Sequence, residues 1–148
     1  MKREVKVVIA EDDEGHAALI KKNLKRAGVM NDILHFRDGQ DTLDFLLHQN
    51  VHHDWTETTP LLLLLDIKMP RLDGIELLRQ IKASSKLRRI PVIMITTTDD
   101  PREVEICHDL GCSHYITKPV VYEKFVAAIR QLGLFLLVVE VPLVKENN

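Results

Sequence analysis

The chain has 148 residues, of which 45% are hydrophobic and 28% are charged, and this composition is typical of one soluble globular domain. The formal net charge of −2 gives no overall attraction for nucleic acid, and the apolar run Leu134–Val139 is far too short to span a bilayer. The two cysteines, Cys107 and Cys112, match neither a zinc motif nor a disulfide framework, and no signal-peptide core is present. We therefore expect two free thiols and a cytoplasmic location.

The first part of the chain alternates two apolar strands with two amphipathic helices. The first predicted strand is Val5–Ala10, and a helix follows from about Glu14 to a cap at Gly28. The apolar face of this helix consists of Ala17, Ile20, Leu24 and Ala27. The second predicted strand is Ile33–Phe36, and Asp38-Gly39 then starts a helix. The inner face of that helix consists of Leu43, Leu46 and Leu47.

Between His48 and Pro60 the apolar pattern gives way to a polar loop. The loop contains three histidines, His48, His52 and His53, but no cysteine or carboxylate completes a recognised metal-ligand spacing. We interpret this segment as an extended helix-to-strand connection rather than as a metal site.

The third predicted strand is a run of five leucines, Leu61–Leu65, which ends in the carboxylate of Asp66. A loop and a helix from about Gly74 to Lys82 follow, and Val92–Thr96 is the fourth predicted strand. The inner face of the helix consists of Leu77, Leu78 and Ile81. A strand of leucines alone is typical of a parallel sheet that helices cover on both faces.

The last part of the chain repeats the same alternation. Pro101 begins a helix that we expect Asp99 to cap and Gly111 to end, and His114–Thr117 is the fifth predicted strand. The final helix has an apolar face consisting of Phe125, Ala128, Ile129 and Leu132. Five strands in alternation with five helices predict an α/β fold, a doubly wound five-stranded parallel sheet of strand order 2-1-3-4-5, flavodoxin-like, with helices on both faces.

In such a sheet the carboxyl ends of all strands share one edge, and polar residues follow four of the five strands there. Glu11, Asp12 and Asp13 follow the first strand, Asp66 follows the third, Thr96 ends the fourth, and Lys118 follows the fifth. Several carboxylates together suit a hard divalent cation, and Mg²⁺ prefers a few carboxylate oxygens plus waters. A lysine and a hydroxyl beside them suit a phosphoryl group, which a carboxylate can accept by attack on phosphorus. Taken singly, an acid at a strand end is commonly a turn cap, a threonine is usually a strand former, and a lysine is usually a solvated surface charge.

The joint pattern resembles the response-regulator receiver domain of two-component signalling, from Val5 to Leu132. The resemblance implies that Asp66 is the phosphoacceptor and that Glu11, Asp12, Asp66 and the backbone carbonyl of Lys68 hold Mg²⁺, for which Mn²⁺ can substitute. Asp13 matches a frequent third acid and is not the preferred ligand. The resemblance also covers the loop motifs Met69-Pro70 and Asp73-Gly74.

The same resemblance assigns the remaining residues of the edge. Thr96 matches the switch hydroxyl, Tyr115 the aromatic residue that turns inward when that hydroxyl moves, and Lys118 the phosphoryl-binding lysine. Pro119 matches the proline that usually follows this lysine in a cis peptide. None of the site positions is missing, so the resemblance implies a competent phosphoacceptor that catalyses only its own phosphorylation and dephosphorylation.

The layout of the whole chain is similar to stand-alone regulators paired with bacterial phytochrome kinases, which implies a light-sensing histidine kinase as phosphodonor. We expect a single receiver domain over residues 1–148, with a C-terminal extension from about residue 133 and no separate output domain. Its output would be a downstream protein or a phosphotransfer protein, with no direct nucleic-acid binding and no membrane insertion. The apolar run Leu134–Val139 predicts a homodimer through the last helix and tail, and the alternative is that the tail folds back over its own sheet.

Two other functions compete with this interpretation. An aspartyl-phosphate phosphatase often carries a second Asp two residues after the nucleophile, where this chain has Lys68, and no substrate cap domain is evident. A flavodoxin-like cofactor binder needs a Ser/Thr/Gly-rich phosphate loop after the first strand, where Glu11, Asp12 and Asp13 would repel a phosphate. Turnover of a phosphomonoester, or a yellow protein, would support these alternatives.

Overall fold

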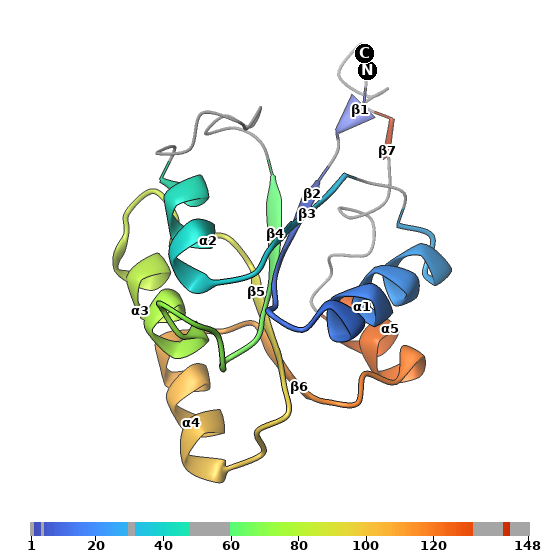
Figure 1. Cartoon of the computed structure of the whole chain (residues 1–148). Coiled ribbons are helices and arrows are strands. Elements are labelled where there is room, and N and C mark those ends of the chain that lie inside the picture. Colours follow the sequence, from blue (N-terminus) through green and yellow to red (C-terminus); the bar gives the residue numbers. More distant parts are fainter. Residues whose placement is uncertain (1, 4, 30–31, 48–59, 132–140, 143–148) are drawn as a thin grey trace.

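The computed structural model describes residues 2–3, 5–29, 32–47, 60–131 and 141–142. Its main body is a parallel sheet between two layers of helices (Figure 1). The strands of the sheet are β2 (Lys6–Ala10), β3 (Ile33–Phe36), β4 (Leu61–Leu65), β5 (Val92–Thr96) and β6 (His114–Thr117). The helices are α1 (Glu14–Arg26), α2 (Gly39–Leu46), α3 (Gly74–Ala83), α4 (Pro101–Leu110) and α5 (Tyr122–Gln131).

The strand order is β3-β2-β4-β5-β6, and every neighbouring pair is parallel. This is the predicted order 2-1-3-4-5, so the α/β, flavodoxin-like prediction is confirmed. The central strands β4 and β5 are buried at every position, which explains why their sequences are apolar runs rather than alternating patterns. The order reverses between β2 and β4, and a crevice for ligands opens at this point of a doubly wound sheet.

Each face of the sheet has its own hydrophobic core. Helices α2, α3 and α4 cover one face and helices α1 and α5 the other (Figure 1). Alternate leucines of β4 divide between the two cores: Leu63 and Leu65 pack with Leu77 of α3, and Leu62 and Leu64 pack in the core that contains Phe125 of α5. The two cores hold the central strands on both sides and so fix the positions of their carboxyl ends.

The helix ends agree with the predictions except at two places. The N-cap of α4 is Asp100, whose side chain accepts a hydrogen bond from the Arg102 backbone N–H, and not Asp99 as expected, because Pro101 is the first residue of the helix and the cap directly precedes it. Helix α2 ends at Leu46, so Leu47 lies at the C-cap with 37% of its surface exposed and is not part of the inner face. Gly28 follows the C-cap of α1 with a positive φ of 91°, as its capping role requires.

A second, two-stranded sheet joins the two ends of the described chain. Strand β1 (Lys2–Arg3) pairs antiparallel with β7 (Val141–Pro142), a pairing that sequence reasoning did not predict. The predictions for the histidine loop, Leu132 and the run Leu134–Val139 lie outside the described residues.

Cys107 and Cys112 are free, buried thiols, and burial raises the pKa of each to about 11. A thiol with such a pKa is almost entirely protonated at neutral pH and therefore a poor nucleophile. None of the helices in the described part of the chain is long and apolar enough to cross a membrane.

Candidate functional site

The predicted site residues lie together at the carboxyl edge of the sheet. Asp66 directly follows β4, and its backbone N–H donates to the carbonyl of Ala10 at the end of β2, which brings the first two polar segments side by side. The Asp66 side chain is 9% exposed, and its Oδ1 accepts a hydrogen bond of 2.7 Å from the Ile67 N–H. This hydrogen bond holds the carboxylate in one orientation.

Glu11, Asp12 and Asp66 form a group of three carboxylates. Each offers one oxygen, and these oxygens lie within 4.8 Å of one another. Glu11 and Asp66 are buried, whereas Asp12 is exposed and lines a cleft of about 570 Å³ together with Lys68, Asp73 and other residues of the loop after β4. Three carboxylates that converge from two strand ends, one of them open to solvent, fit the oxygen ligands and waters that Mg²⁺ prefers.

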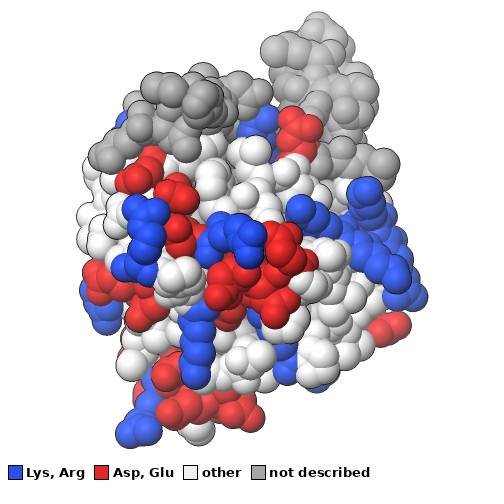
Figure 2. Space-filling model, viewed as in Figure 1, with Lys and Arg blue, Asp and Glu red and all other residues white. Residues whose placement is uncertain are grey.

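Charges of both signs mark the same face of the molecule. Acidic side chains gather in the middle of this face, and basic side chains gather beside them over α1 (Figure 2). The basic residues of that helix are Lys21, Lys22, Lys25 and Arg26.

Burial is the largest cause that raises the pKa of Glu11 above its ordinary value, and the hydrogen bond from Lys118 opposes it.

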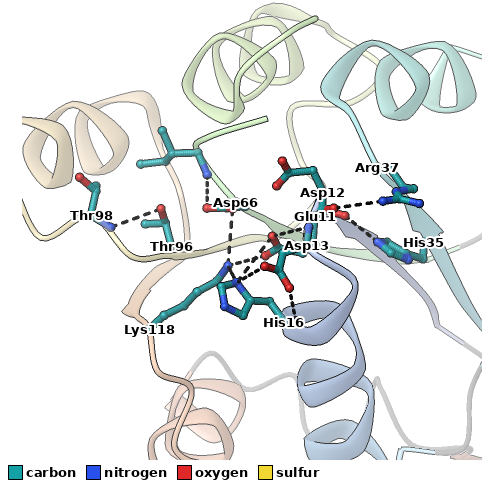
Figure 3. Close-up of polar contacts among 11 residues, drawn as sticks. Glu11, Asp12, Asp13, His16, His35, Arg37, Asp66, Thr96, Thr98 and Lys118 are labelled. Carbon is teal, nitrogen blue, oxygen red and sulfur yellow. Dashed lines mark hydrogen bonds and ion pairs between the residues drawn. The ribbon is translucent and has the colours of Figure 1, made fainter. Parts of the chain in front are cut away.

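The ammonium group of Lys118 lies at the centre of the site (Figure 3). Its Nζ is 2.5 Å from Oε1 of Glu11 and 3.5 Å from Oδ2 of Asp66, and only 6% of the side chain is exposed. The cation thus bridges carboxylates from the ends of two different strands. The peptide bond between Lys118 and Pro119 is cis, as the resemblance implied.

His16 is a close neighbour of Lys118 that sequence reasoning missed. Its Nδ1 is 2.8 Å from Nζ of Lys118, and its backbone N–H donates to Oδ1 of Asp13, the N-cap of α1. Asp13 therefore starts the helix rather than joining the three carboxylates. The only sequence signal for His16 is its place in the first turn of a helix that follows an acidic segment.

Two side chains, one in the edge strand β3 and one just after it, hold the backbone of the acidic segment. Nε2 of His35 lies 2.7 Å from the carbonyl of Glu11, and because a carbonyl only accepts, this ring nitrogen carries the proton. The guanidinium of Arg37 donates to the carbonyl of Asp12 at 3.5 Å and pairs with Glu14 at 3.1 Å. These contacts tie the acidic segment to β3 and its following loop.

Of the predicted switch residues, Thr96 is the last residue of β5, and Tyr115 is the second residue of the neighbouring strand β6. Thr96 is fully buried, and its Oγ1 accepts from the Thr98 N–H at 3.5 Å. The hydroxyl of Tyr115 donates to the Thr98 carbonyl at 2.9 Å. Thr98 therefore connects the two predicted switch side chains through its own backbone.

The loop after Asp66 returns to the site at Gly74. The Gly74 N–H donates to the carbonyl of Ile67 at 2.7 Å. A Cβ on this glycine would lie 2.0 Å from the Asp66 carbonyl oxygen, which is far inside contact distance. Gly74 is therefore required for α3 to begin directly against the backbone of Asp66.

Comparisons with known proteins agree with this arrangement. A family model for the response regulator receiver domain matches residues 7–130. The chain is 48% identical to a response regulator receiver domain from Rhodospirillum rubrum, with a TM-score of 0.74 and coverage of 93% of this chain and 96% of that chain. It is 34% identical to the bacteriophytochrome response regulator RtBRR, with a TM-score of 0.76 and coverage of 88% and 78%.

A third similar structure is the Mn²⁺-bound form of the response regulator Rcp1, at 28% identity, a TM-score of 0.71 and coverage of 89% of this chain and 94% of that chain. The family model spans most of the chain, and the five-stranded fold and the strand-end residues are those that the motifs predicted. The chain therefore belongs to the response regulator receiver domain family.

Proposed function

We propose that this chain is a single-domain response regulator that accepts a phosphoryl group from a histidine kinase onto Asp66 and thereby changes its protein contacts. The observation that carries the proposal is the buried Lys118 ammonium between Glu11 and Asp66, beside the exposed carboxylate of Asp12. A cation and a divalent-metal site around one fixed carboxylate suit in-line phosphoryl transfer, which depends mainly on positioning and charge.

In the proposed reaction a carboxylate oxygen of Asp66 attacks the phosphorus of a phosphohistidine. The new O–P bond forms as the P–N bond breaks, and the imidazole leaves with that electron pair and takes up a proton. Lys118 donates an N–H to a phosphoryl oxygen, and the Thr96 hydroxyl donates to another. Hydrolysis of the resulting acyl phosphate returns the carboxylate and inorganic phosphate.

The metal ligands in this proposal are the carboxylates of Glu11, Asp12 and Asp66 and the backbone carbonyl of Lys68. A bound Mg²⁺ would neutralise the charge of the phosphoryl oxygens. Both oxygens of Glu11 already have donors, Lys118 at Oε1 and the Asp13 N–H at Oε2, whereas no hydrogen bond to the Asp12 carboxylate is found among the described residues. Asp12 is therefore the freer ligand of the two.

Acetyl phosphate supplies the simplest test of the proposal. The wild-type protein should gain one phosphoryl group in the presence of Mg²⁺ or Mn²⁺ and none in excess chelator. Asp66→Asn should gain none under any condition, because an amide is a poor nucleophile, whereas Asp109→Asn, at an exposed position of α4, should behave as the wild type. Phosphorylation of Asp66→Asn, or full activity in chelator, would overturn the assignment.

We propose a histidine kinase of the bacterial phytochrome class as the donor. The similarity to RtBRR, a bacteriophytochrome response regulator, supports this choice. The test is to incubate the protein with several phosphorylated kinases and to time the transfer from each. The phytochrome kinase should transfer fastest, and faster transfer from an unrelated kinase would refute the pairing.

We also propose a homodimer through the final helix and the tail. This proposal rests on the sequence, because the apolar run Leu134–Val139 lies outside the described residues. Light scattering should give a dimer at micromolar concentration without phosphate and a monomer for the double variant Phe135→Asp, Leu136→Asp. A monomeric wild type, or a dimer that this variant leaves intact, would refute it.

A further inference from the structure

The contact between His16 and Lys118 has no part in the reaction proposed above. His16 lies in the first turn of α1, where the N-cap bond of Asp13 fixes its backbone, and its side chain is 45% exposed. Its Nδ1 reaches inward to within 2.8 Å of the buried Nζ of Lys118 (Figure 3). A half-exposed imidazole thus covers the buried ammonium from the solvent side.

The chemistry of this contact fixes the state of the imidazole. An ammonium group only donates hydrogen bonds, so Nδ1 of His16 must accept one from Lys118 and carries no proton. The ring is therefore neutral, with its proton on Nε2. The lone pair of Nδ1 accepts the hydrogen bond from Lys118, so His16 in this position is a hydrogen-bond acceptor and not a general base.

Each of the three N–H donors of the Lys118 ammonium group faces one neighbouring acceptor. Two N–H groups face the close acceptors, Oε1 of Glu11 at 2.5 Å and Nδ1 of His16 at 2.8 Å. The remaining N–H faces Oδ2 of Asp66 at 3.5 Å, a distance longer than that of a good ammonium–carboxylate hydrogen bond. The third N–H thus points at Asp66 but forms only a weak hydrogen bond with it.

We propose that His16 is a positioning residue that directs the third N–H of Lys118 at the phosphoryl oxygens on Asp66, an inference that rests on the proposed function. A donor already oriented before the reaction stabilises the charge of the transferring group without reorganisation. A neutral acceptor suits this position, because a further carboxylate would hold Lys118 equally well but would repel the incoming phosphoryl group.

The test compares rates of phosphorylation by acetyl phosphate in Mg²⁺ for variants of His16 in the full-length chain. His16→Leu and His16→Ala remove the acceptor, and each should lower the maximum rate by about tenfold, the lower end of the losses seen when partners that orient the groups of a metal site are removed. The acetyl phosphate concentration for half-maximal rate should stay the same. His16→Asn places its amide oxygen near the position of Nδ1 and should restore the rate to within about threefold of the wild type. Leu19→Ala, three residues further along α1 and exposed, is the matched control.

A double-mutant cycle separates positioning through Lys118 from any direct effect of His16. In the background of Lys118→Met, replacement of His16 by Leu should cause no further loss of rate or of beryllofluoride affinity. An equal loss in both backgrounds, unchanged rates in both His16→Leu and His16→Ala, or failure of His16→Asn to rescue would overturn the inference while leaving the proposed function intact. A wild-type protein that gains no phosphoryl group would overturn both.

Discussion

Glu11 and Lys118 are charged residues that the fold keeps almost entirely away from water, with 1% and 6% of their side chains exposed. A buried ion pair of this kind adds little net stability, but the loss of one partner leaves the other charge uncompensated. The pair therefore holds the site in one arrangement, but it also makes the stability of the fold sensitive to substitution of either residue and to pH.

Removal of the lysine should reveal this sensitivity. In Lys118→Met the pKa of Glu11 rises further, because the hydrogen bond that lowers it is lost. A raised pKa in the folded state favours the fold as long as Glu11 is protonated. The variant should therefore lose little stability below pH 4.5, the ordinary pKa of Glu. The loss of stability should grow as the pH rises from there through the folded-state pKa of Glu11. We expect a loss of about 3 kcal/mol at neutral pH in urea denaturation with chelator present. The double variant with Glu11→Gln should lose this pH dependence, and a pH-independent loss in the single variant would contradict the account.

Glu11 and Asp12 differ in how freely their carboxylates reach a metal. Glu11 has both oxygens occupied by donors, whereas Asp12 is exposed toward the cleft that Lys68 also lines. Asp12→Asn should therefore weaken Mg²⁺ binding by about tenfold, or ~1.4 kcal/mol, and Glu11→Gln by less. Calorimetric titration with Mg²⁺ measures both, and a larger effect at Glu11 would reverse the ligand assignment.

At the level of whole elements, the start of α3 is fixed by a backbone-to-backbone contact. A side chain on Gly74 would collide with the carbonyl of Asp66, and the backbone on both sides belongs to packed elements. Gly74→Ala should therefore cost at least ~2 kcal/mol in stability and slow phosphorylation. Gly15→Ala is the control, since its nearest neighbour would be the end of a side chain at 3.3 Å. Equal stability of the Gly74 variant and the wild type in urea denaturation would contradict this role.

The end of β5 and its contact with Tyr115 of β6 form the route by which the site should reach the surface. Thr96 and Tyr115 both bond to the backbone of Thr98, so a movement of the Thr96 hydroxyl toward a phosphoryl group alters the contact that holds the Tyr115 ring. A difference of a few kcal/mol suffices for a ligand to bias two such states.

NMR signals of the Tyr115 ring report this coupling. Addition of beryllofluoride with Mg²⁺ should shift them as the ring turns inward, and Thr96→Ala should abolish the shift by removing the hydroxyl. Asp66→Asn serves as the control that cannot bind the mimic. A ring environment that stays the same in the wild type would count against this route.

For the molecule as a whole, the sequence predicts the sheet better than it predicts the contacts across it. Apolar runs such as Leu61–Leu65 are explicit, and their alternation with amphipathic helices leaves few possible topologies. Asp99 and Asp100 are chemically the same, so only the position of the helix start distinguishes the cap. The pairing of β1 with β7 involves two residues on each side, too few for a recognisable pattern.

In the site, too, the sequence predicts some features and leaves others unpredicted. The strand-end residues were found because the parallel sheet brings all carboxyl ends to one edge, and their types suit one chemistry together. His16 was missed because its partner, Lys118, is 102 residues away in sequence and a single histidine in a helix carries no pattern of its own. Glu11 and Lys118 were both predicted as site residues, but their direct contact across 107 residues of sequence was not.

The most direct test of the account is to identify the residue that carries the phosphoryl group. The protein is phosphorylated with acetyl phosphate and Mg²⁺, reduced with borohydride, which converts an aspartyl phosphate to homoserine, and digested for mass spectrometry. The account predicts homoserine at position 66 alone, where the carboxylate lies beside Lys118 and the acidic cluster. Homoserine at Asp12 or Asp13, or a phosphoryl group on a histidine with Asp66 unmodified, would contradict it.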